Sequence, residues 1–464
     1  MTHQFNTSIF REYDIRGTFN KTFFTADAYE IGLRFATILH QCHKNPLICI
    51  GRDGRLSSPD LSLALIQGLR DAGANILDVG VGPTPMLYYA TKITPAVAGV
   101  MVTGSHNPPE DNGLKLTLKD FPFFGPQIQE LKDTVPQTSE TPGSLEFIDL
   151  RDQYLDRLLI DAPKKTTQKL KIVWDCGNGA AGEIIEMLTA RLQNHSILLN
   201  TTIDGTFPAH PADPAVEENL VQLCDTVAAH NCDIGIAFDG DADRIGVIDK
   251  KGRVIWGDQL LCLLAEDVLR HNPGAKIIAD VKSSQALFNY IEKLEGIAVM
   301  GKTGHSNIKT QLREIGAALA GEMSGHIFFA DTYYGYDDAI YAAIRLISFL
   351  ETQSKSLHEL YDQLPKYYNT PEIRIPCDDQ HKFEIVQKIR ADLEKNGTNF
   401  IAIDGVRVTT ESGWWLVRAS NTQSILVARC EAYTKEQLPH LIQHMKTVLE
   451  PYVGAGALGM DKFY

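Results

Sequence analysis

The chain lacks a hydrophobic run long enough to cross a membrane, since no segment approaches about 18 consecutive apolar residues. Its first residues, Met-Thr-His-Gln-Phe-Asn, include neither the basic stretch nor the apolar stretch of a secretory signal. The 8 cysteines are scattered and form no Cys-x-x-Cys pair, a pattern typical of buried thiols in a reducing compartment. We therefore expect a cytoplasmic protein that does not associate with a membrane.

Positive charge is also scarce. Lys and Arg number 44 against 58 Asp and Glu, which gives a formal net charge of -14. Because nucleic acids attract basic surfaces, we expect no nucleic-acid partner, and any anion site must be assembled locally from a few cations. A chain of 464 residues, 44% of them hydrophobic, is too long for one core, so three or four domains are expected.

A strand, a polar loop, a helix and a second strand recur three times along the chain. The three units begin near residues 47, 171 and 276. This internal repeat predicts three similar mixed α/β domains whose sheets are largely parallel and covered by helices. Ligands of such sheets gather beyond the carboxyl ends of the strands, so the loops there are candidate sites.

The pattern changes near residue 368. Residues 372–376 alternate like a strand, residues 382–395 form an amphipathic helix pattern, several strands follow between 400 and 431, and a helix closes the chain over 435–449. This order predicts a smaller α+β domain with an antiparallel sheet. The expected domains are 1–148, 149–253, 254–367 and 368–464, with the active site in the central cleft.

The loop after the apolar strand 98–102 reads Thr-Gly-Ser-His-Asn-Pro-Pro, and its Ser105 is the candidate nucleophile. The two prolines cannot continue a sheet, so Ser105 is expected on a tight, exposed loop at a strand end. Such a loop offers a hydroxyl and free backbone N–H groups, which suits covalent work on phosphate. An ordinary Ser/Asn/Pro turn explains the same residues without any chemistry.

A second motif, Asp-Gly-Asp-Ala-Asp-Arg, places Asp239, Asp241 and Asp243 at alternate positions between two apolar strands. Three such carboxylates need a cation, and hard oxygen ligands favour Mg²⁺; a solvated acidic turn is the alternative. An EF-hand is excluded because its sixth position is Arg244 and its twelfth is Lys250.

Residues 296–303 read Gly-Ile-Ala-Val-Met-Gly-Lys-Thr and satisfy the P-loop pattern. The apolar run 297–300 favours a buried strand, whereas a P-loop needs these residues to wrap a phosphate, so we interpret the match as accidental. The polar loop that follows contains Lys302 and His305. With Lys282 of the preceding strand end, these are candidate phosphate or sugar contacts, although single lysines are usually solvated.

Two further loops carry groups suited to a phosphorylated sugar. Glu322 and Ser324 lie two apart on an extended loop, so both can bond adjacent hydroxyls, and His326 is a candidate acid or base as well as a candidate structural histidine. In the last domain, Arg418 precedes three short polar residues that together offer a forked donor set for a phosphate, or form a hairpin turn. The three are Ser420, Asn421 and Thr422.

The serine motif, together with Asn-Gly-Leu-Lys at 112–115, resembles the phosphoserine loop of the alpha-D-phosphohexomutases, close to the bacterial phosphomannomutase/phosphoglucomutase branch. The resemblance covers essentially the whole chain. It implies that Ser105 is carried as a phosphoserine whose phosphoryl oxygen joins the three aspartates around Mg²⁺. It also implies sugar contacts for Glu322 and Ser324 and phosphate contacts for the Arg418 loop. Tyr13 and Arg16, in a segment that a solvated loop would also explain, complete the expected substrate contacts.

The resemblance implies a reversible interconversion of hexose 1-phosphate and hexose 6-phosphate through a bound hexose 1,6-bisphosphate. Arg244 would neutralise charge on the transferring group, and the base is Lys115 or His326, between which the sequence does not choose. Met323 favours mannose or glucose phosphate over the phosphoglucosamine mutases, which stay an alternative. A metal-dependent sugar phosphatase and a non-enzymatic phosphosugar-binding protein are the others. We expect a monomer.

Overall fold

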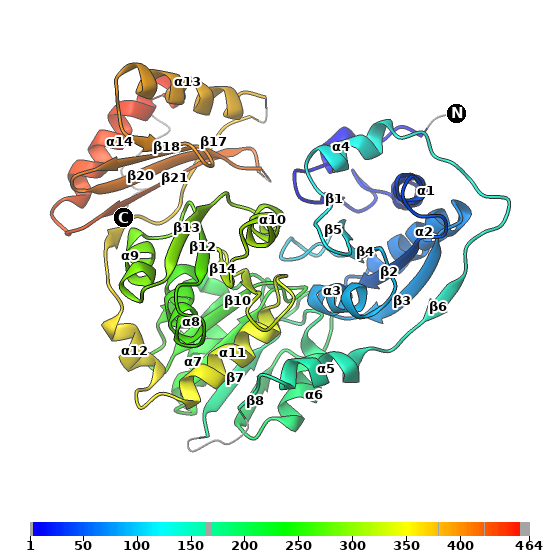
Figure 1. Cartoon of the computed structure of the whole chain (residues 1–464), viewed down its shortest axis with the longest axis horizontal. Coiled ribbons are helices and arrows are strands. Elements are labelled where there is room, and N and C mark those ends of the chain that lie inside the picture. Colours follow the sequence, from blue (N-terminus) through cyan, green and yellow to red (C-terminus); the bar gives the residue numbers. More distant parts are fainter. Residues whose placement is uncertain (1–2, 164–168, 379, 422, 455–464) are drawn as a thin grey trace.

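The computed structural model describes residues 3–163, 169–378, 380–421 and 423–454. The described chain forms four sheets, one after another along the sequence (Figure 1). Three combine parallel and antiparallel strands, and the fourth is antiparallel throughout. The predicted class is confirmed: three similar mixed α/β domains precede an α+β domain. No helix among the described residues is both long and apolar enough to cross a membrane.

The first sheet has the strand order β1-β5-β4-β2-β3-β6, in which β2 pairs in parallel with β3 and β4. Two of its helices, α1 and α2, pack unusually close because each carries a glycine at the contact. A Cβ atom at Gly32 would lie 2.5 Å from the carbonyl oxygen of Leu65, and one at Gly68 would lie 2.0 Å from that of Tyr29. The bounds are η1 Thr7–Ile9, β1 Ile15–Thr18, α1 Thr25–His40, β2 Leu47–Arg52, α2 Ser58–Asp71, β3 Asn75–Val81, α3 Thr84–Ile93, β4 Ala98–Val102, β5 Asp111–Leu118, α4 Pro126–Asp133 and β6 Leu145–Phe147.

The second and third sheets share one hydrophobic core. Ile236 of the second sheet, Leu261 of α8 and Ile340 of α11 are all fully or almost fully buried within it. The second unit comprises α5 Arg151–Leu159, β7 Lys171–Asp175, α6 Gly182–Arg191, β8 His195–Leu199, η2 Glu217–Leu220, α7 Val221–Ala229, β9 Ile234–Phe238, β10 Ile245–Asp249 and β11 Val254–Ile255. The third comprises α8 Gly257–His271, β12 Lys276–Asp280, α9 Gln285–Lys293, β13 Ile297–Gly301, α10 His305–Ile315, β14 Leu319–Gly321, β15 Ile327–Phe329, α11 Ala339–Glu351 and α12 Leu357–Gln363. Since β13 is a strand, the P-loop pattern at 296–303 is accidental, as predicted.

The fourth sheet has its own core, which includes Trp415, Val417 and Met445. Its helix α13 has the predicted bounds, whereas the closing helix begins three residues later and ends four residues later than the predicted 435–449. The elements are β16 Tyr368–Asn369, β17 Ile373–Pro376, α13 Lys382–Lys395, β18 Phe400–Ile401, β19 Val406–Thr410, β20 Gly413–Ala419, β21 Ile425–Ala432 and α14 Leu438–Val453.

Candidate functional site

The serine loop at the end of β4 is fixed by two residues that follow β2. Arg55 is buried, and its Nη2 donates to the carbonyl oxygens of Ser105 (2.7 Å) and Asn107 (2.6 Å). Asp53 accepts hydrogen bonds from Thr103 Oγ1 at 2.7 Å and from the N–H of Gly104 at 3.2 Å. The loop is therefore held by charge-assisted bonds on both of its sides, which hold Ser105 in the left-handed backbone region, with φ 51°.

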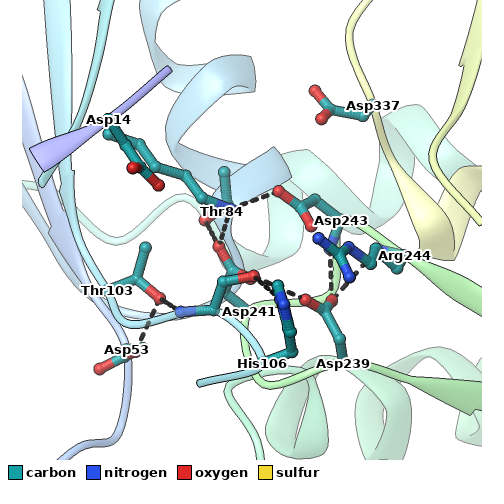
Figure 2. A network of polar contacts seen from close by, with 12 residues as sticks. Asp14, Asp53, Thr84, Thr103, His106, Asp239, Asp241, Asp243, Arg244 and Asp337 are labelled. Atoms are coloured by element: carbon teal, nitrogen blue, oxygen red, sulfur yellow. Dashed lines mark hydrogen bonds and ion pairs between the residues drawn. The ribbon is translucent and has the colours of Figure 1, made fainter. Parts of the chain in front are cut away.

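The prediction that Ser105 is exposed is wrong, because only 2% of this residue is accessible to solvent. The turn between β9 and β10 of the second domain covers it, and a Cβ atom at Gly240 would lie 2.4 Å from the Ser105 carbonyl oxygen. The hydroxyl donates to Asp239 Oδ2 at 2.9 Å, and its oxygen lies 3.2 Å from His106 Nδ1 (Figure 2). Ser105 therefore points at the aspartate motif rather than at bulk solvent.

The aspartates of the motif are fully buried. Asp239 Oδ1 accepts the backbone N–H groups of Asp243 (3.0 Å) and Arg244 (3.1 Å), which shapes the turn. Burial raises the pKa of Asp239 well above its usual range, and the charges of Asp243 and Asp241 raise it further. A cluster with this much repulsion needs a compensating cation.

Lys115 supplies one cation from β5 of the first domain. Its Nζ donates to Asp241 Oδ2 at 2.6 Å and also to Asp243, while Thr84 donates to the same Asp241 oxygen. Burial opposes the charge of Lys115, but the carboxylates of Asp241 and Asp243 outweigh it and raise the lysine pKa. Burial likewise opposes the charge of Asp241, yet the Lys115 ammonium lowers the pKa of that carboxyl. Lys115 is thus held as an ammonium group.

The three aspartates could also bind a metal ion. Each of Asp239, Asp241 and Asp243 offers a carboxylate oxygen, and these atoms lie within 4.8 Å of one another. Oδ1 of Asp241 and Oδ1 of Asp243 are buried and have no hydrogen-bond partner within the described ranges. Buried, unsatisfied carboxylate oxygens fit a hard divalent cation.

His326 lies beside this cluster and is 4% exposed. Its Nε2 accepts a hydrogen bond from Arg244 Nε at 3.0 Å, and its Nδ1 lies 3.1 Å from Asp337 Oδ2. Since arginine can only donate, these partners assign the ring proton to Nδ1. The predicted His305 lies close by, with its ring centroid 5.5 Å from that of His326.

The N-terminal segment reaches the other domains through Tyr13. Its hydroxyl donates to the Thr303 carbonyl at 2.8 Å and accepts from Asn421 Nδ2 at 2.6 Å, so one side chain joins the first, third and fourth domains. Arg16, in contrast, binds the serine loop itself. Its Nη1 donates to the Gly104 carbonyl at 2.7 Å and to an asparagine side chain of that loop at 3.0 Å.

In the third domain, Glu322 is buried and accepts the N–H of Gly304 at 2.6 Å, and burial raises its pKa. Lys282 Nζ lies 3.5 Å from a carboxylate of Glu372, in the segment that leads into β17. Lys302 is half-buried on the loop that contains Gly304, and Ser324 is half-buried on the loop that contains Glu322.

In the fourth domain, the buried Arg418 donates through Nε to Asp404 Oδ2 at 2.8 Å. Ser420 Oγ accepts the N–H of Gln423 at 3.1 Å. Thr422, the last predicted member of the phosphate loop, lies outside the described residues.

Sequence reasoning missed Asp337, Asp404, Asp53, Arg55 and Thr84. Asp53 and Arg55 stand in a polar loop directly after a strand of the first repeat, which is a usable signal. Asp337, Asp404 and Thr84 belong to no motif, and only the folded chain brings them to the site.

Comparison with known proteins identifies similar proteins over nearly the whole length of the chain. Four family models match in order: phosphoglucomutase/phosphomannomutase alpha/beta/alpha domain I over residues 7–142, domain II over 152–252, domain III over 256–368 and the C-terminal domain over 372–447. A phosphomannomutase/phosphoglucomutase of Pseudomonas putida is 44% identical, and the match covers 95% of each chain. A phosphoglucomutase of Neisseria gonorrhoeae is 41% identical over 95% of this chain and 96% of its own. The crystal structure of a phosphoglucomutase/phosphomannomutase family protein from Burkholderia thailandensis superposes with a TM-score of 0.91 at 40% identity, covering 98% of this chain and 99% of that one.

Proposed function

The chain belongs to the phosphoglucomutase/phosphomannomutase family, and we propose that it works through phosphorylated Ser105, which exchanges a phosphoryl group with positions 1 and 6 of a hexose. It is an isomerase of the intramolecular phosphotransferase class, a phosphomannomutase/phosphoglucomutase. The observation that carries the mechanism is the buried Ser105 hydroxyl, 2.9 Å from Asp239 in a cluster of three aspartates. A phosphoryl group on this oxygen would add negative charge beside three carboxylates. The site must therefore also supply positive charge that compensates it.

The reaction consists of two transfers. In the first, the bond between Ser105 Oγ and phosphorus breaks as a hydroxyl oxygen of the bound hexose monophosphate bonds to phosphorus; the hydroxyl proton passes to a base, and the released Ser105 oxygen takes up a proton. The product, hexose 1,6-bisphosphate, reorients in the site. In the second, Ser105 Oγ gives up its proton and bonds to the phosphorus of the other phosphate, the bond from that phosphorus to the sugar oxygen breaks, and the sugar oxygen takes up a proton from the base. Binding of Mg²⁺ by Asp239, Asp241, Asp243 and a phosphoryl oxygen of Ser105 would neutralise charge on the transferring group, a role that Arg244 shares.

For the base we propose His326 rather than Lys115. Lys115 contacts two carboxylates that favour its ammonium form, which suits a proton donor or a charge stabiliser. His326 presents Nε2 as an acceptor, now bonded to Arg244, while its Nδ1 lies 3.1 Å from Asp337 Oδ2. When Arg244 turns toward a phosphate, this nitrogen becomes free to take a proton.

The remaining predicted residues are proposed as substrate contacts. Arg418 anchors the loop that holds the phosphate which is not reacting, and Glu322 with Ser324 bonds the sugar hydroxyls. The other proposed contacts are Tyr13, Arg16, Lys282, Lys302, His305, Ser420, Asn421 and Thr422. The domain bounds 1–148, 149–253, 254–367 and 368–464 are part of the same proposal, as is a monomeric protein of the cytoplasm. Because one chain supplies every residue named for the site, no second subunit is required.

The test is direct. The purified protein is incubated separately with glucose 1-phosphate, mannose 1-phosphate and glucosamine 1-phosphate, each with Mg²⁺ and catalytic bisphosphate, and the products are followed by phosphorus NMR. Formation of glucose and mannose 6-phosphates, dependent on the bisphosphate, is expected. Net release of inorganic phosphate would identify a phosphatase, and turnover of the glucosamine ester alone would overturn the sugar preference.

A further inference from the structure

A cavity of about 590 Å³ lies between the first and third domains. Within the described chain, its lining comes from α3, the segment after β5, α10 and the loop after β15, and includes neither Ser105 nor the three aspartates. Its volume falls within the range of about 300–1,000 Å³ that small-molecule sites occupy, and domain junctions are common places for such sites. It is therefore a second place on the molecule that can hold a ligand.

Cations of both domains converge at this cavity. Lys92 Nζ and Arg313 Nη1 lie 3.4 Å and 3.0 Å from the same oxygen, Asp120 Oδ1. Lys119 also lines the cavity. Burial lowers the pKa of Lys92, and the Asp120 carboxylate opposes this effect. Lys92 and Arg313 thus share one carboxylate oxygen of Asp120, a side chain that is 52% exposed, and this oxygen marks where an anionic oxygen is held.

Aromatic rings stand beside the cations. Phe121 is 45% exposed and lies with its ring centroid 4.3 Å from the guanidinium carbon of Arg313. Tyr334 is 38% exposed and stacks on Tyr336, with the ring planes inclined by 8°. Partly exposed aromatic rings beside a forked cation suit a planar ring that carries phosphate.

We propose that this cavity binds a nucleoside diphosphate, with its phosphates on Lys92 and Arg313 and its base against the exposed rings. The proposal goes beyond the phosphotransfer reaction and does not depend on it.

The cavity also has a physical connection to the site. Lys309 lines the cavity, and its Nζ lies 3.0 Å from Asp337 Oδ1. The other carboxylate oxygen of Asp337, Oδ2, lies 3.1 Å from His326 Nδ1. A ligand that draws Lys309 away from Asp337 changes the contacts that orient His326. We therefore expect the bound nucleotide to lower the turnover of hexose phosphate without excluding the substrate from its site.

The experiment is calorimetric titration of the full chain with ADP, in the presence of saturating glucose 1,6-bisphosphate so that phosphate-binding groups of the site are filled. The expected result is binding that persists under these conditions and is weakened about tenfold or more in the double variant Lys92→Ala/Arg313→Ala, since two charge-assisted contacts are lost. The control is Arg390→Ala, which also removes an exposed helix arginine from an ion pair, at 2.9 Å from Glu394. Phe121→Ala should weaken ADP but leave pyrophosphate unchanged.

Three results would overturn the proposal. They are ADP binding that disappears when the bisphosphate is added, binding that is equal in the double variant and the control, and pyrophosphate that binds as tightly as ADP. Complete absence of ADP binding has the same meaning.

Discussion

Ser105 is a buried residue whose hydroxyl has two acceptors within reach, Asp239 and His106. Partial burial and the nearby charge of Arg244 lower the pKa of His106 well below its usual range, so its ring is neutral. The serine hydroxyl can therefore donate to either group, and both orient Oγ toward the carboxylate cluster. The chemistry of Ser105 therefore depends on where its Oγ points, toward the carboxylates, more than on how much of the side chain is exposed to solvent.

We predict that Ser105→Ala removes nearly all mutase activity, because no other group occupies the position of Oγ. Relative to the unphosphorylated wild type, the variant also leaves Asp239 without one donor, which should cost on the order of 1–2 kcal/mol of unfolding free energy and leave the fold intact. Steady-state assays and intact-mass analysis check this, with one phosphate expected on the wild type alone. The exposed Ser354→Ala is the control, and comparable turnover in the two variants would contradict a covalent mechanism.

Asp338 gives a second prediction at this scale. Burial raises its pKa to about 6 from the usual 3.8, against hydrogen bonds from Tyr341, Tyr333 and Tyr154. The folded state therefore binds more protons than the unfolded state between about pH 4 and pH 6, so stability from this group is present below pH 4 and is lost as pH rises through 6. The size is on the order of 3 kcal/mol.

Because asparagine keeps the shape of the protonated carboxyl, Asp338→Asn should remove this part of the pH dependence. Thermal melts of the wild type and the variant between pH 4 and pH 8 measure it. The variant should gain stability relative to the wild type as pH rises, while the exposed Asp152→Asn should run parallel to the wild type. Parallel curves for Asp338→Asn would show that its carboxylate is not destabilised.

Among the elements, the turn between β9 and β10 concentrates negative charge in a place that only a cation can balance. We predict that chelation abolishes activity and that added Mg²⁺ restores it. Asp241→Asn should weaken Mg²⁺ binding by about tenfold or more, because it removes one charged ligand. Titration calorimetry measures the affinity without any turnover, with Asp225→Asn on α7 as the control. Full activity after exhaustive chelation would contradict the metal assignment.

The loop after β20 gives the next prediction. In the proposed role, Arg418 and its neighbours would bind the phosphate that is not reacting and take no part in proton transfer, so Arg418→Ala should raise KM for 1-phosphate and 6-phosphate substrates by similar factors, about tenfold or more. Asp404→Asn should have a smaller effect in the same direction, because Asp404 would act on the phosphate through the guanidinium that it orients. Kinetics in both directions measure this, and Ser105 phosphorylation should persist. Impairment with one regioisomer alone would refute a shared phosphate loop.

The sequence predicted the helices and strands better than it predicted which of them come into contact in the fold. Strand β13 and helix α13 follow from apolar runs and periodicity, which are local properties of the sequence. The aspartate motif is equally local, since its three carboxylates are two residues apart. The burial of Ser105 is not, because the turn that covers it comes from a domain that begins after residue 150. Asp337 and Asp404 were missed for the same reason: each is a lone acid whose partner lies in another element.

At the scale of the whole molecule, the second and third domains share a hydrophobic core, and the side chain of Tyr13 joins three of the four domains. Its hydroxyl bonds the Thr303 carbonyl and the Asn421 amide, which belong to the third and fourth domains. Thr303 N in turn donates to Asp404 Oδ2 at 3.2 Å, the carboxylate that orients Arg418. A change at Tyr13 can therefore reach the loop of Arg418 through Thr303 and Asp404 without altering Arg418 itself.

We predict that Tyr13→Phe loosens this junction, since it removes one hydroxyl and keeps the ring that packs beside His305. The backbone amides of residues 301–305 should exchange hydrogen faster, and KM should rise several-fold in both directions while Ser105 is still phosphorylated. Tyr29→Phe removes a hydroxyl that bonds Asp71 within the first domain, so it makes the same chemical change away from the junction. If exchange at 301–305 is the same in both variants, the hydroxyl of Tyr13 does not hold the domains together.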